Sequence, residues 1–353
     1  MLSLEGRRWG KFRIGELFEI VQGKCSNASE LKRDNPTVPY LGATRRNNAV
    51  LDFVDADEKL MQKGNCIAFI KDGEGSMGYS VYKAEDFIAT TNIALGYAPF
   101  LNRYTGIFIT VAADKVRGRY SYNYKRNEER LKNEMIQLPV DEAGNPDWSF
   151  MEAFMREREQ AMLREYVAEV RGRIEDREAL TLEGVRWECF ILGEVFDIKQ
   201  TANGIDKINL VQGEGLYPYI TRSSMNNGVN MLVPLQEGYR LNDGNCIAVG
   251  LDTQTAFYQP TEFYTGQNIQ ILRHERMNEY SGKFLLSPLK KTLSIYSWGG
   301  NGATLTRLRR SKIFLPVNDE GNPDWQFMED YMQGQEQAML RKYLAYLESR
   351  LEQ

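Results

Sequence analysis

Histidine and cysteine are scarce in this chain of 353 residues. His274 is the only histidine, and the four cysteines, Cys25, Cys66, Cys189 and Cys246, lie far apart. Zinc motifs place paired ligands a few residues apart, so this spacing excludes a zinc knuckle. Any catalytic Ser/His/Asp or Cys/His set would have to include His274. We expect His274 to be a plain surface residue instead. Cys66 and Cys246 stand in matching apolar runs and are expected to be small buried residues in a reducing cytoplasm.

Long apolar runs and targeting signals are missing too. No run of 18 apolar residues occurs, so we expect no membrane-spanning helix. The first six residues lack the basic head and apolar core of a signal peptide, so we expect a cytoplasmic protein. Hydrophobic residues make up 42% of the chain, as in ordinary globular proteins, and the length suffices for two domains with real cores.

The chain has no overall excess of basic residues, since its formal net charge is −4. Positive charge is nevertheless concentrated in two segments. Residues 115–132 hold seven Lys or Arg and two Glu, and residues 283–312 hold seven Lys or Arg and no acidic residue. Residues 150–176, in contrast, hold seven acidic and five basic residues. Basic patches in corresponding places of the globular parts and acidic segments between them would suit two kinds of partner. The alternative, that they are solvated faces, is weaker for two corresponding patches than it would be for one.

The sequence is a tandem duplication with an offset of 176 to 180 residues. Residues 2–9 return as 180–187, and Gly-Asn-Cys-Ile-Ala at 64–68 returns at 244–248. Each copy contains short apolar runs bounded by turn residues, which are typical of strands, and closes with a long helical pattern. We therefore predict an α+β fold of two tandem, mixed but mostly β domains, each followed by a long helix. The expected segments are 1–143 for the first domain, 144–176 for the first helix, 177–184 for a linker, 185–320 for the second domain and 321–353 for the second helix.

The two closing helices begin with nearly the same nonapeptide, at 144–152 and 321–329. We expect Asn145 to cap the first helix and Pro146 to occupy its first turn, where no hydrogen bond is lost. Apolar residues then recur at intervals of four, three and four, a narrow seam suited to one partner helix. The seam residues are Leu163, Val167, Val170 and Ile174 in the first helix and Leu340, Leu344, Leu347 and Leu351 in the second. The duplication favours pairing of the helices with each other, as a coiled coil with a pseudo-twofold axis, over packing of each helix on its own domain.

Three motifs point to catalysis, and none is convincing. Residues 73–78 match the Gly-x-Gly-x-x-Gly dinucleotide fingerprint, but a strand pattern follows where the fingerprint needs a helix. Residues 145–148 resemble the Asn-Pro-Pro-Tyr/Trp element of amino-methyltransferases, but the third residue is Asp147 and no loop for S-adenosylmethionine stands upstream. A metal-dependent nuclease needs a carboxylate cluster, and neither 30–32 nor 57–59 has the upstream Pro-Asp. We therefore expect no catalytic residues and no metal ligands.

Polar loops at equivalent places in the two copies suit DNA. Arg pairs bidentately with guanine and Asn with adenine, while basic side chains contact phosphates. A turn kept for structural reasons explains the paired asparagines equally well. The candidate DNA-contacting residues of the first copy are Arg45, Arg46, Asn47, Asn48, Lys71, Tyr122, Tyr124, Lys125 and Arg126. Those of the second copy are Arg222, Ser223, Asn226, Asn227, Trp298, Asn301, Arg307, Arg309 and Arg310.

The order of these features resembles the DNA-specificity subunits of restriction-modification systems. The resemblance covers essentially the whole chain. It is carried by the Trp9…Phe12…Gly15-Glu16…Phe18 opening and its copy at 187–196, the Gly-Asn-Cys-Ile-Ala strands, and the Leu-Pro-Val ends at 138–140 and 315–317. It implies two target-recognition domains that read a bipartite DNA target, and helices that pack antiparallel. The helix start Pro-Asp-Trp-x-Phe-Met-Glu looks most like the type IIB branch, whose partner is a fused nuclease–methyltransferase.

The resemblance implies a non-catalytic subunit that binds double-stranded DNA and methyltransferase or fused nuclease–methyltransferase subunits. S-Adenosylmethionine and Mg²⁺ would belong to the partner and not to this chain. The near-identity of exposed-type residues on the two helices predicts two docking surfaces, and hence two partner subunits, at Glu159, Gln160, Glu336 and Gln337. Two alternatives remain open at this point: a self-sufficient DNA methyltransferase or nuclease, and a protein-interaction scaffold that does not bind DNA.

Overall fold

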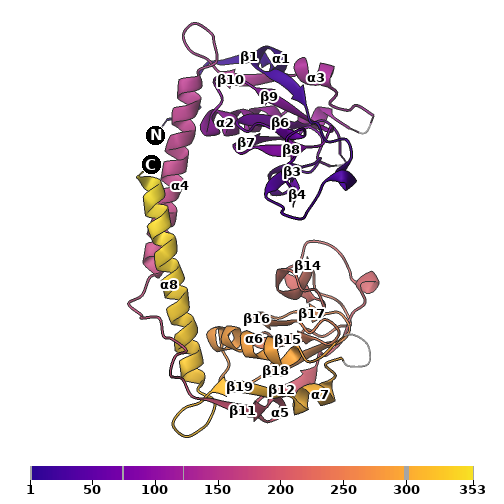
Figure 1. Cartoon of the computed structure of the whole chain (residues 1–353), viewed down its shortest axis with the longest axis vertical. Helices are drawn as coiled ribbons and strands as arrows, with labels where there is room; N and C mark the ends of the chain where they lie inside the picture. The colour runs from indigo at the N-terminus through magenta and orange to yellow at the C-terminus, as the bar shows by residue number, and fades with distance from the viewer. Residues whose placement is uncertain (1, 74, 122, 298–301, 353) are drawn as a thin grey trace. The chain divides into compact units, whose positions relative to one another are not determined.

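The computed structural model describes residues 2–73, 75–121, 123–297 and 302–352. Two compact units make up the chain, Met1–Tyr166 and Val167–Gln353. Each unit contains one globular domain: the first domain runs from β1 to β10, and the second from β11 to β19 (Figure 1). Within the described ranges, no helix is both long and apolar enough to cross a membrane.

The first domain consists of a four-stranded sheet in the order β2-β9-β6-β7, a second four-stranded sheet in the order β4-β3-β8-β5, and a pair formed by β1 and β10. Strands β3 and β8 are parallel, whereas the other pairings are antiparallel. The strands are β1 (Trp9–Arg13), β2 (Glu19–Gln22), β3 (Val38–Leu41), β4 (Val50–Val54), β5 (Met61–Gln62), β6 (Cys66–Ile70), β7 (Ser80–Lys83), β8 (Phe87–Ala89), β9 (Ile93–Tyr97) and β10 (Met135–Pro139). The helices are α1 (Ile14–Leu17), η1 (Ala28–Glu30), η2 (Asn47–Ala49), α2 (Arg103–Asp114), η3 (Arg117–Arg119) and α3 (Glu128–Lys132).

The second domain repeats this plan with sheets in the orders β12-β18-β15-β16 and β14-β13-β17 and with a β11–β19 pair. Its strands are β11 (Trp187–Ile191), β12 (Asp197–Gln200), β13 (Tyr217–Ile220), β14 (Val229–Val233), β15 (Cys246–Gly250), β16 (Ala256–Gln259), β17 (Tyr264–Thr265), β18 (Ile269–Arg273) and β19 (Lys312–Pro316). Its helices are α5 (Leu192–Val195), η4 (Lys207–Asn209), η5 (Asn226–Gly228), α6 (Glu279–Leu293) and α7 (Leu305–Arg310). The α+β fold of two tandem, mixed domains is thereby confirmed.

The central strands β6 and β15 are continuous apolar runs, and all five residues of each are buried. Such runs occur where a strand is covered on both faces. Cys66 and Cys246 open these strands with fully buried side chains, and burial raises the pKa of each thiol to about 12. The expectation that both cysteines are small buried residues is therefore confirmed.

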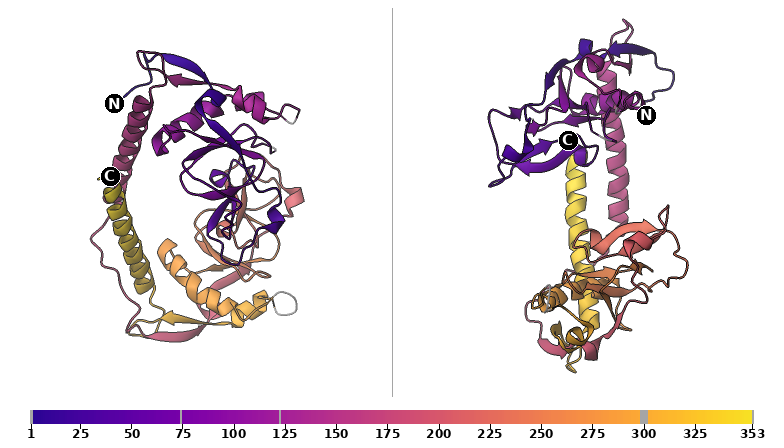
Figure 2. Two further views of the ribbon diagram at one scale, coloured as in Figure 1. Left: turned by 45° about the horizontal axis from the view of Figure 1, so that its top comes forward. Right: turned by 90° about the vertical axis from the view of Figure 1, so that its right-hand side faces the viewer.

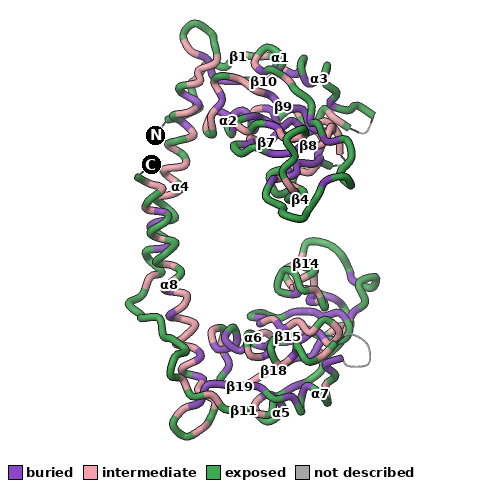
Figure 3. The backbone as a smooth tube through the Cα atoms, in the orientation of Figure 1, coloured by how far each residue is buried: buried purple, intermediate pink, exposed green. Residues whose placement is uncertain are grey.

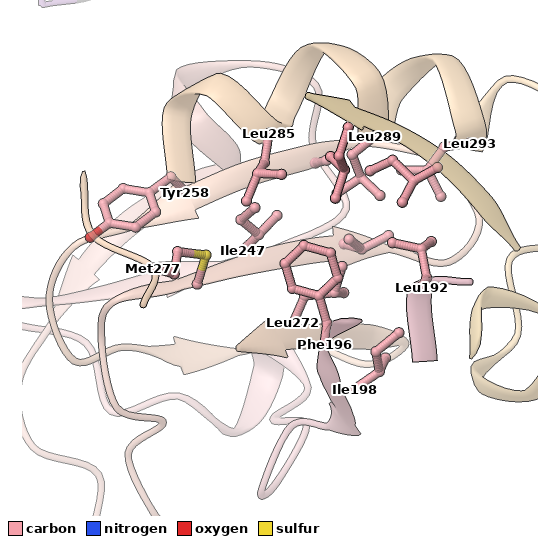
Figure 4. Close-up of a cluster of buried hydrophobic side chains, with 14 of the residues drawn as sticks. Leu192, Phe196, Ile198, Ile247, Tyr258, Leu272, Met277, Leu285, Leu289 and Leu293 are labelled. Atoms are coloured by element: carbon pink, nitrogen blue, oxygen red, sulfur yellow. The ribbon is translucent and has the colours of Figure 1, made fainter. Parts of the chain in front are cut away.

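The core of the second domain lies between its four-stranded sheet and α6. Leu285, Leu289 and Leu293 recur every four residues on α6 and point toward Ile247 and Leu272 of the sheet (Figure 4). The burial pattern follows this arrangement, because strands such as β15 and β18 are buried while the surrounding loops are largely exposed (Figure 3). This packing fixes the scaffold from which the loops project.

The long helices begin four residues after the starts of the expected segments, 144 and 321. They are α4 (Trp148–Arg173) and α8 (Trp325–Leu351), and α8 is one uninterrupted rod in both views of Figure 2. Asp147 and not Asn145 accepts from the first turn, since its carboxylate takes the amide of Phe150 at 3.0 Å. Pro146 instead forms a bridge with Val140. The prediction that Asn145 caps the helix was wrong because the Asn-Pro pair closes a turn behind β10.

Within the second unit, the end of α4 and the segment after it run antiparallel to α8. Arg171 donates to Glu348 at 2.6 Å, Arg173 to Glu336 at 3.2 Å, and Arg177 pairs with Asp330 at 3.4 Å, so successive residues meet earlier positions of α8. The expected seam residues Val167, Val170 and Leu347 are buried in this unit. A coiled coil over the full length of both helices stays a prediction.

His274 is not the plain surface residue that we expected. Its ring stacks on the indole of Trp325, with 4.1 Å between centroids and 14° between planes, and its Nδ1 accepts from the amide of Arg276 at 3.0 Å. Burial lowers the pKa of His274 below its usual value of 6.5. In the first domain the equivalent tryptophan, Trp148, stacks on Phe100 instead.

This stacking predicts a pH effect on stability. Because the folded chain holds His274 neutral, the unfolded chain takes up the proton more readily, so stability present above about pH 6.5 is lost as the pH falls. We expect the unfolding temperature of the second domain to drop between pH 7.5 and pH 5.5, and to drop less in His274→Phe, which keeps a ring against Trp325. Equal pH dependence in both chains would contradict the assignment to His274.

Candidate nucleic-acid interface

The paired asparagines form a tight turn in each domain. Asn47 and Asn48 have φ angles of 48° and 52° in η2, and Asn226 and Asn227 have 51° and 56° in η5. Asn enters this left-handed region more easily than other residues that carry a side chain. The Asn48 side chain donates to a carbonyl of β7 at 3.5 Å, and that of Asn227 to a carbonyl of β16 at 3.0 Å. The turns thus have a structural role, while all four asparagines remain exposed.

Arg45 lies just before the first turn and contacts Tyr79. Its Nη1 donates to the Tyr79 hydroxyl at 3.2 Å. A second guanidinium, that of Arg117, lies 4.6 Å from the centroid of the same ring. Next to these groups is an open pocket of about 680 Å³, lined by Asp72, Gly73, Gly75, Met77, Tyr79, Arg117, Tyr120 and Ser121. Two guanidinium groups gathered on one tyrosine at the mouth of a pocket suit phosphates and base edges. Arg46, the next residue, is exposed, and its amide donates to Thr44.

The loop between β6 and β7 is tied to the segment before α3. Lys125 pairs with Asp72 at 2.6 Å. Tyr124 is exposed, and the guanidinium of Arg130 lies over its ring, 3.9 Å from the centroid. Lys71 is half-buried, and burial lowers the pKa of its amine. The structure therefore brings Lys71, Tyr124 and Lys125 toward the same pair of loops, whereas Tyr122 lies outside the described residues.

Arg126 was wrongly assigned to DNA contact. Its side chain is fully buried and forks onto Glu134, with Nε to Oε2 at 2.9 Å and Nη2 to Oε1 at 2.5 Å. A guanidinium without exposed surface cannot reach DNA. Basic and aromatic residues surround Arg126 in the sequence, so that only the three-dimensional packing distinguishes it from its exposed neighbours.

The equivalent surface of the second domain is built differently. When the asparagine turns are superposed in sequence, Arg45 matches Ser224, and Arg222 matches Ala43. Arg222 forms an ion pair with Asp252, in the short connection between β15 and β16. Ser223 accepts from the amide of Met225 at 3.0 Å. The two domains thus carry their arginines at different positions before the shared asparagine turn.

The basic residues of α7 have mixed surroundings. Arg309 donates through Nε and Nη2 to the carbonyl of Ile198 at 3.2 and 2.6 Å, which fastens α7 to β12. Arg307 donates to the carbonyl of Gly302 at 3.0 Å. Arg307 and Arg310 also line a pocket of about 620 Å³, with Pro288, Lys291, Thr292, Ile295, Tyr296, Ser311, Lys312 and Phe314. Trp298 and Asn301, which were also assigned to DNA, lie outside the described residues.

Side-chain contacts within the chain involve three of the four helix residues assigned to a partner, Glu159, Glu336 and Gln337. Gln337 is buried; its side chain accepts from the amide of Glu175 at 2.8 Å and donates to the carbonyl of Arg173 at 3.2 Å. Glu336 accepts from the hydroxyl of Tyr280 at 2.8 Å, Glu159 pairs with Arg103, and Gln160 is half-buried. Since Glu159, Glu336 and Gln337 make contacts within the chain, their match in the two copies does not by itself indicate a docking surface. Partner binding at these positions stays a prediction.

Two residues of this interface escaped the sequence reasoning, Tyr79 and Arg117. Arg117 lies in the basic segment 115–132, which was recognised as a whole, but nothing in the sequence ranks it above its neighbours. Tyr79 follows the glycine-rich loop, where it reads as a strand residue. Within the part of the chain that the structure describes, no group of three or more His, Cys, Asp or Glu residues could hold a metal ion.

Comparisons with known proteins return consistent matches. A sequence model of the type I restriction modification DNA specificity domain matches the chain twice, over residues 6–165 and 184–341. The type II restriction enzyme specificity subunit S.BcgI of Heyndrickxia coagulans is 24% identical over 338 residues, which are 94% of this chain and 96% of that protein. The S subunit of a type I restriction-modification system from M. genitalium has a similar fold, with a TM-score of 0.50 at 15% identity over 99% of this chain and 96% of that one.

Proposed function

This chain belongs to the type I restriction modification DNA specificity domain family, and on that premise we propose that each of its two domains reads one half of a split DNA target. The chain is a specificity subunit with two tandem recognition domains. It is non-catalytic and acts within a methyltransferase complex, as its family does.

The proposal depends on one observation: the two domains share a scaffold but have different exposed loops. Strands β6 and β15 share the sequence Gly-Asn-Cys-Ile-Ala at and before their starts, and both domains keep the asparagine turn. The connection to the next strand, however, spans nine residues at 71–79 and five at 251–255. Similar scaffolds with different loops are expected of two readers of different sequences, since recognition residues concentrate on loops that a rigid scaffold holds.

The charged groups at these loops supply the required chemistry. Arg45, Arg117 and Lys125 in the first domain, and Arg222 and Arg310 in the second, can contact phosphates or the acceptor edge of guanine. Contacts to phosphate give affinity that falls with salt, whereas contacts to base edges give sequence preference. The net charge of −4 means that this affinity depends on local patches and not on the whole chain.

The partner carries the chemistry of methylation in this proposal. Methyltransferase subunits would dock on α4 and α8, one on each helix, and would bring S-adenosylmethionine. If the partner is a fused nuclease–methyltransferase, it would also bring Mg²⁺ for cleavage.

Single arginine variants test the assignment of halves. Arg45→Ala is expected to relax one base position in the half read by the first domain, because a lost bidentate contact costs about 1–3 kcal/mol. Arg222→Ala should do the same in the other half. The measurement is a binding selection on randomised DNA with the assembled complex. Lys125→Ala serves as a control that weakens all sequences alike and reduces the salt dependence. A change caused by Arg45→Ala in the half that Arg222→Ala also alters would refute the division.

A further inference from the structure

A buried ion pair underlies the candidate reading surface of the first domain. The side chains of Arg126 and Glu134 are 0% and 1% exposed. Glu134 also accepts from the hydroxyl of Tyr120 at 2.6 Å. The remaining nitrogen of the guanidinium, Nη1, donates to the carbonyl of Tyr79 at 3.3 Å and to the hydroxyl of Ser80 at 3.4 Å. Both charges are therefore satisfied by groups of the same domain.

The partners of this pair come from separate segments of the chain. Tyr79 ends the loop between β6 and β7, Tyr120 lies in the basic segment 115–132, and Glu134 directly precedes β10. Tyr79 and Tyr120 also line the open pocket of the first domain together with Arg117. The backbone of one pocket wall and the hydroxyl of the other are thus fastened to a single buried charge pair.

The second domain fills the same positions with small neutral residues. Arg126 directly precedes the capping residue of α3, and its counterpart before α7 is Ala303, which is fully buried. The counterpart of Glu134 is Ser311, whose hydroxyl lies 2.5 Å from that of Tyr296, the counterpart of Tyr120. The tyrosine contact is therefore kept in both domains, and the ion pair is peculiar to the first.

The comparison of the two domains shows whether the common scaffold or the loops of the first domain require the ion pair. Burying an ion pair carries a large desolvation cost, and well-packed neutral residues are often at least as stable in its place. Since the second domain folds around Ala303 and Ser311, the frame does not require the pair. What differs above it is the longer β6–β7 loop and the arginines that contact Tyr79.

We propose that Arg126 and Glu134 are positioning residues that fix the 71–79 loop against the 115–127 segment and thereby set the base preference of the first domain. The proposal rests on the proposed function, because it deepens how the first domain reads its half of the target. Neither residue touches DNA; both act through Tyr79 and Tyr120, whose placement sets where Arg45 and Arg117 point.

The test gives the first domain the residues that the second domain has at the two positions. In Arg126→Ala/Glu134→Ser both charges are removed together and the tyrosine keeps a hydroxyl partner, so the first domain should fold. The complex of this variant is used in a binding selection on randomised DNA. We expect the preference for the correct base in the half read by the first domain to fall about tenfold at one or more positions, the size of one lost base contact, and the other half to stay unchanged.

A matched control removes a neighbouring ion pair that has no such role. Glu128 and Lys132 pair at 2.7 Å on the exposed side of α3, and Glu128→Ala/Lys132→Ala should leave both halves unchanged. If the double variant at the buried pair fails to unfold cooperatively, Arg126→Met/Glu134→Gln takes its place. It removes both charges, fills the space of the pair and keeps an amide oxygen that can accept from Tyr120, so the same relaxation confined to one half is expected.

The outcomes are distinct. Relaxation confined to the first domain's half supports the proposal, and relaxation of both halves or of neither, in a folded variant, overturns it. A wild-type complex that selects no bipartite target overturns the proposed function itself, independently of the variants.

Discussion

A chain whose second domain is replaced by a copy of the first is expected to recognise the first domain's half-site twice. Residues 7–143 would replace residues 185–320, between glycines that are identical at both junctions. The graft should seat correctly because each domain is attached to its own helix in the same way. Asn102 donates to Glu152 of α4 at 2.8 Å, and Asn278 to the equivalent Glu329 of α8 at 2.7 Å.

The expected change is large, because every base of one half-site is replaced. A binding selection on randomised DNA should recover two copies of one half-site and none of the other. The reciprocal graft, with residues 185–320 in place of 7–143, is the matched control and should recover only the other half-site. A graft that folds and still selects the original target would mean that the domains do not read the halves separately.

Replacing Gly64 with alanine is expected to destabilise the first domain by about 3 kcal/mol or more while leaving the stability of the second unchanged. A Cβ at Gly64 would lie 2.1 Å from the carbonyl oxygen of Ala84, so that the backbone itself must move. Overpacking costs about 1–3 kcal/mol and occasionally more, and a clash with fixed backbone belongs at or above the upper end. Gly244, the equivalent glycine, has the same problem at 2.4 Å from the carbonyl oxygen of Pro260.

Hydrogen exchange measures this effect for each domain in one sample. In Gly64→Ala the amides of β6 and β9 should lose protection while those of β15 and β18 keep it, and Gly244→Ala should show the reverse pattern. Gly172→Ala is the control, because a Cβ there meets nothing within 4 Å and alanine favours the helix by about 1 kcal/mol. Normal protection throughout Gly64→Ala would show that the strand connection is more adaptable than the structure indicates.

The parts of the fold that could be predicted are those encoded by local pattern and repetition. Strands β6 and β15 are apolar runs between turn residues, and their positions followed from the sequence with little error. The long helices were found from the spacing of their apolar residues. The expected segments began four residues too early, because whether Asn145 or Asp147 caps α4 depends on the bridge between Pro146 and Val140.

The parts that could not be predicted depend on tertiary contacts. Arg126 and Lys125 are adjacent and chemically similar in the sequence, yet one is fully buried on Glu134 and the other lies at the surface. Gln337 matches Gln160 in the repeat, which suggested a shared docking surface, but its side chain donates to the carbonyl of Arg173 at the end of α4 and accepts from the amide of Glu175. A residue that matches in the repeat can therefore make a contact within the chain and need not indicate a partner.

The central claim, that this chain directs methylation to a target read in two halves, is tested most directly by mapping methylated bases in the genome of cells with and without this gene. The account predicts that deletion removes one methylated motif composed of two unlike short sequences separated by a fixed number of unread base pairs. A methylation pattern that is unchanged by the deletion, or the loss of a single continuous motif, would contradict it.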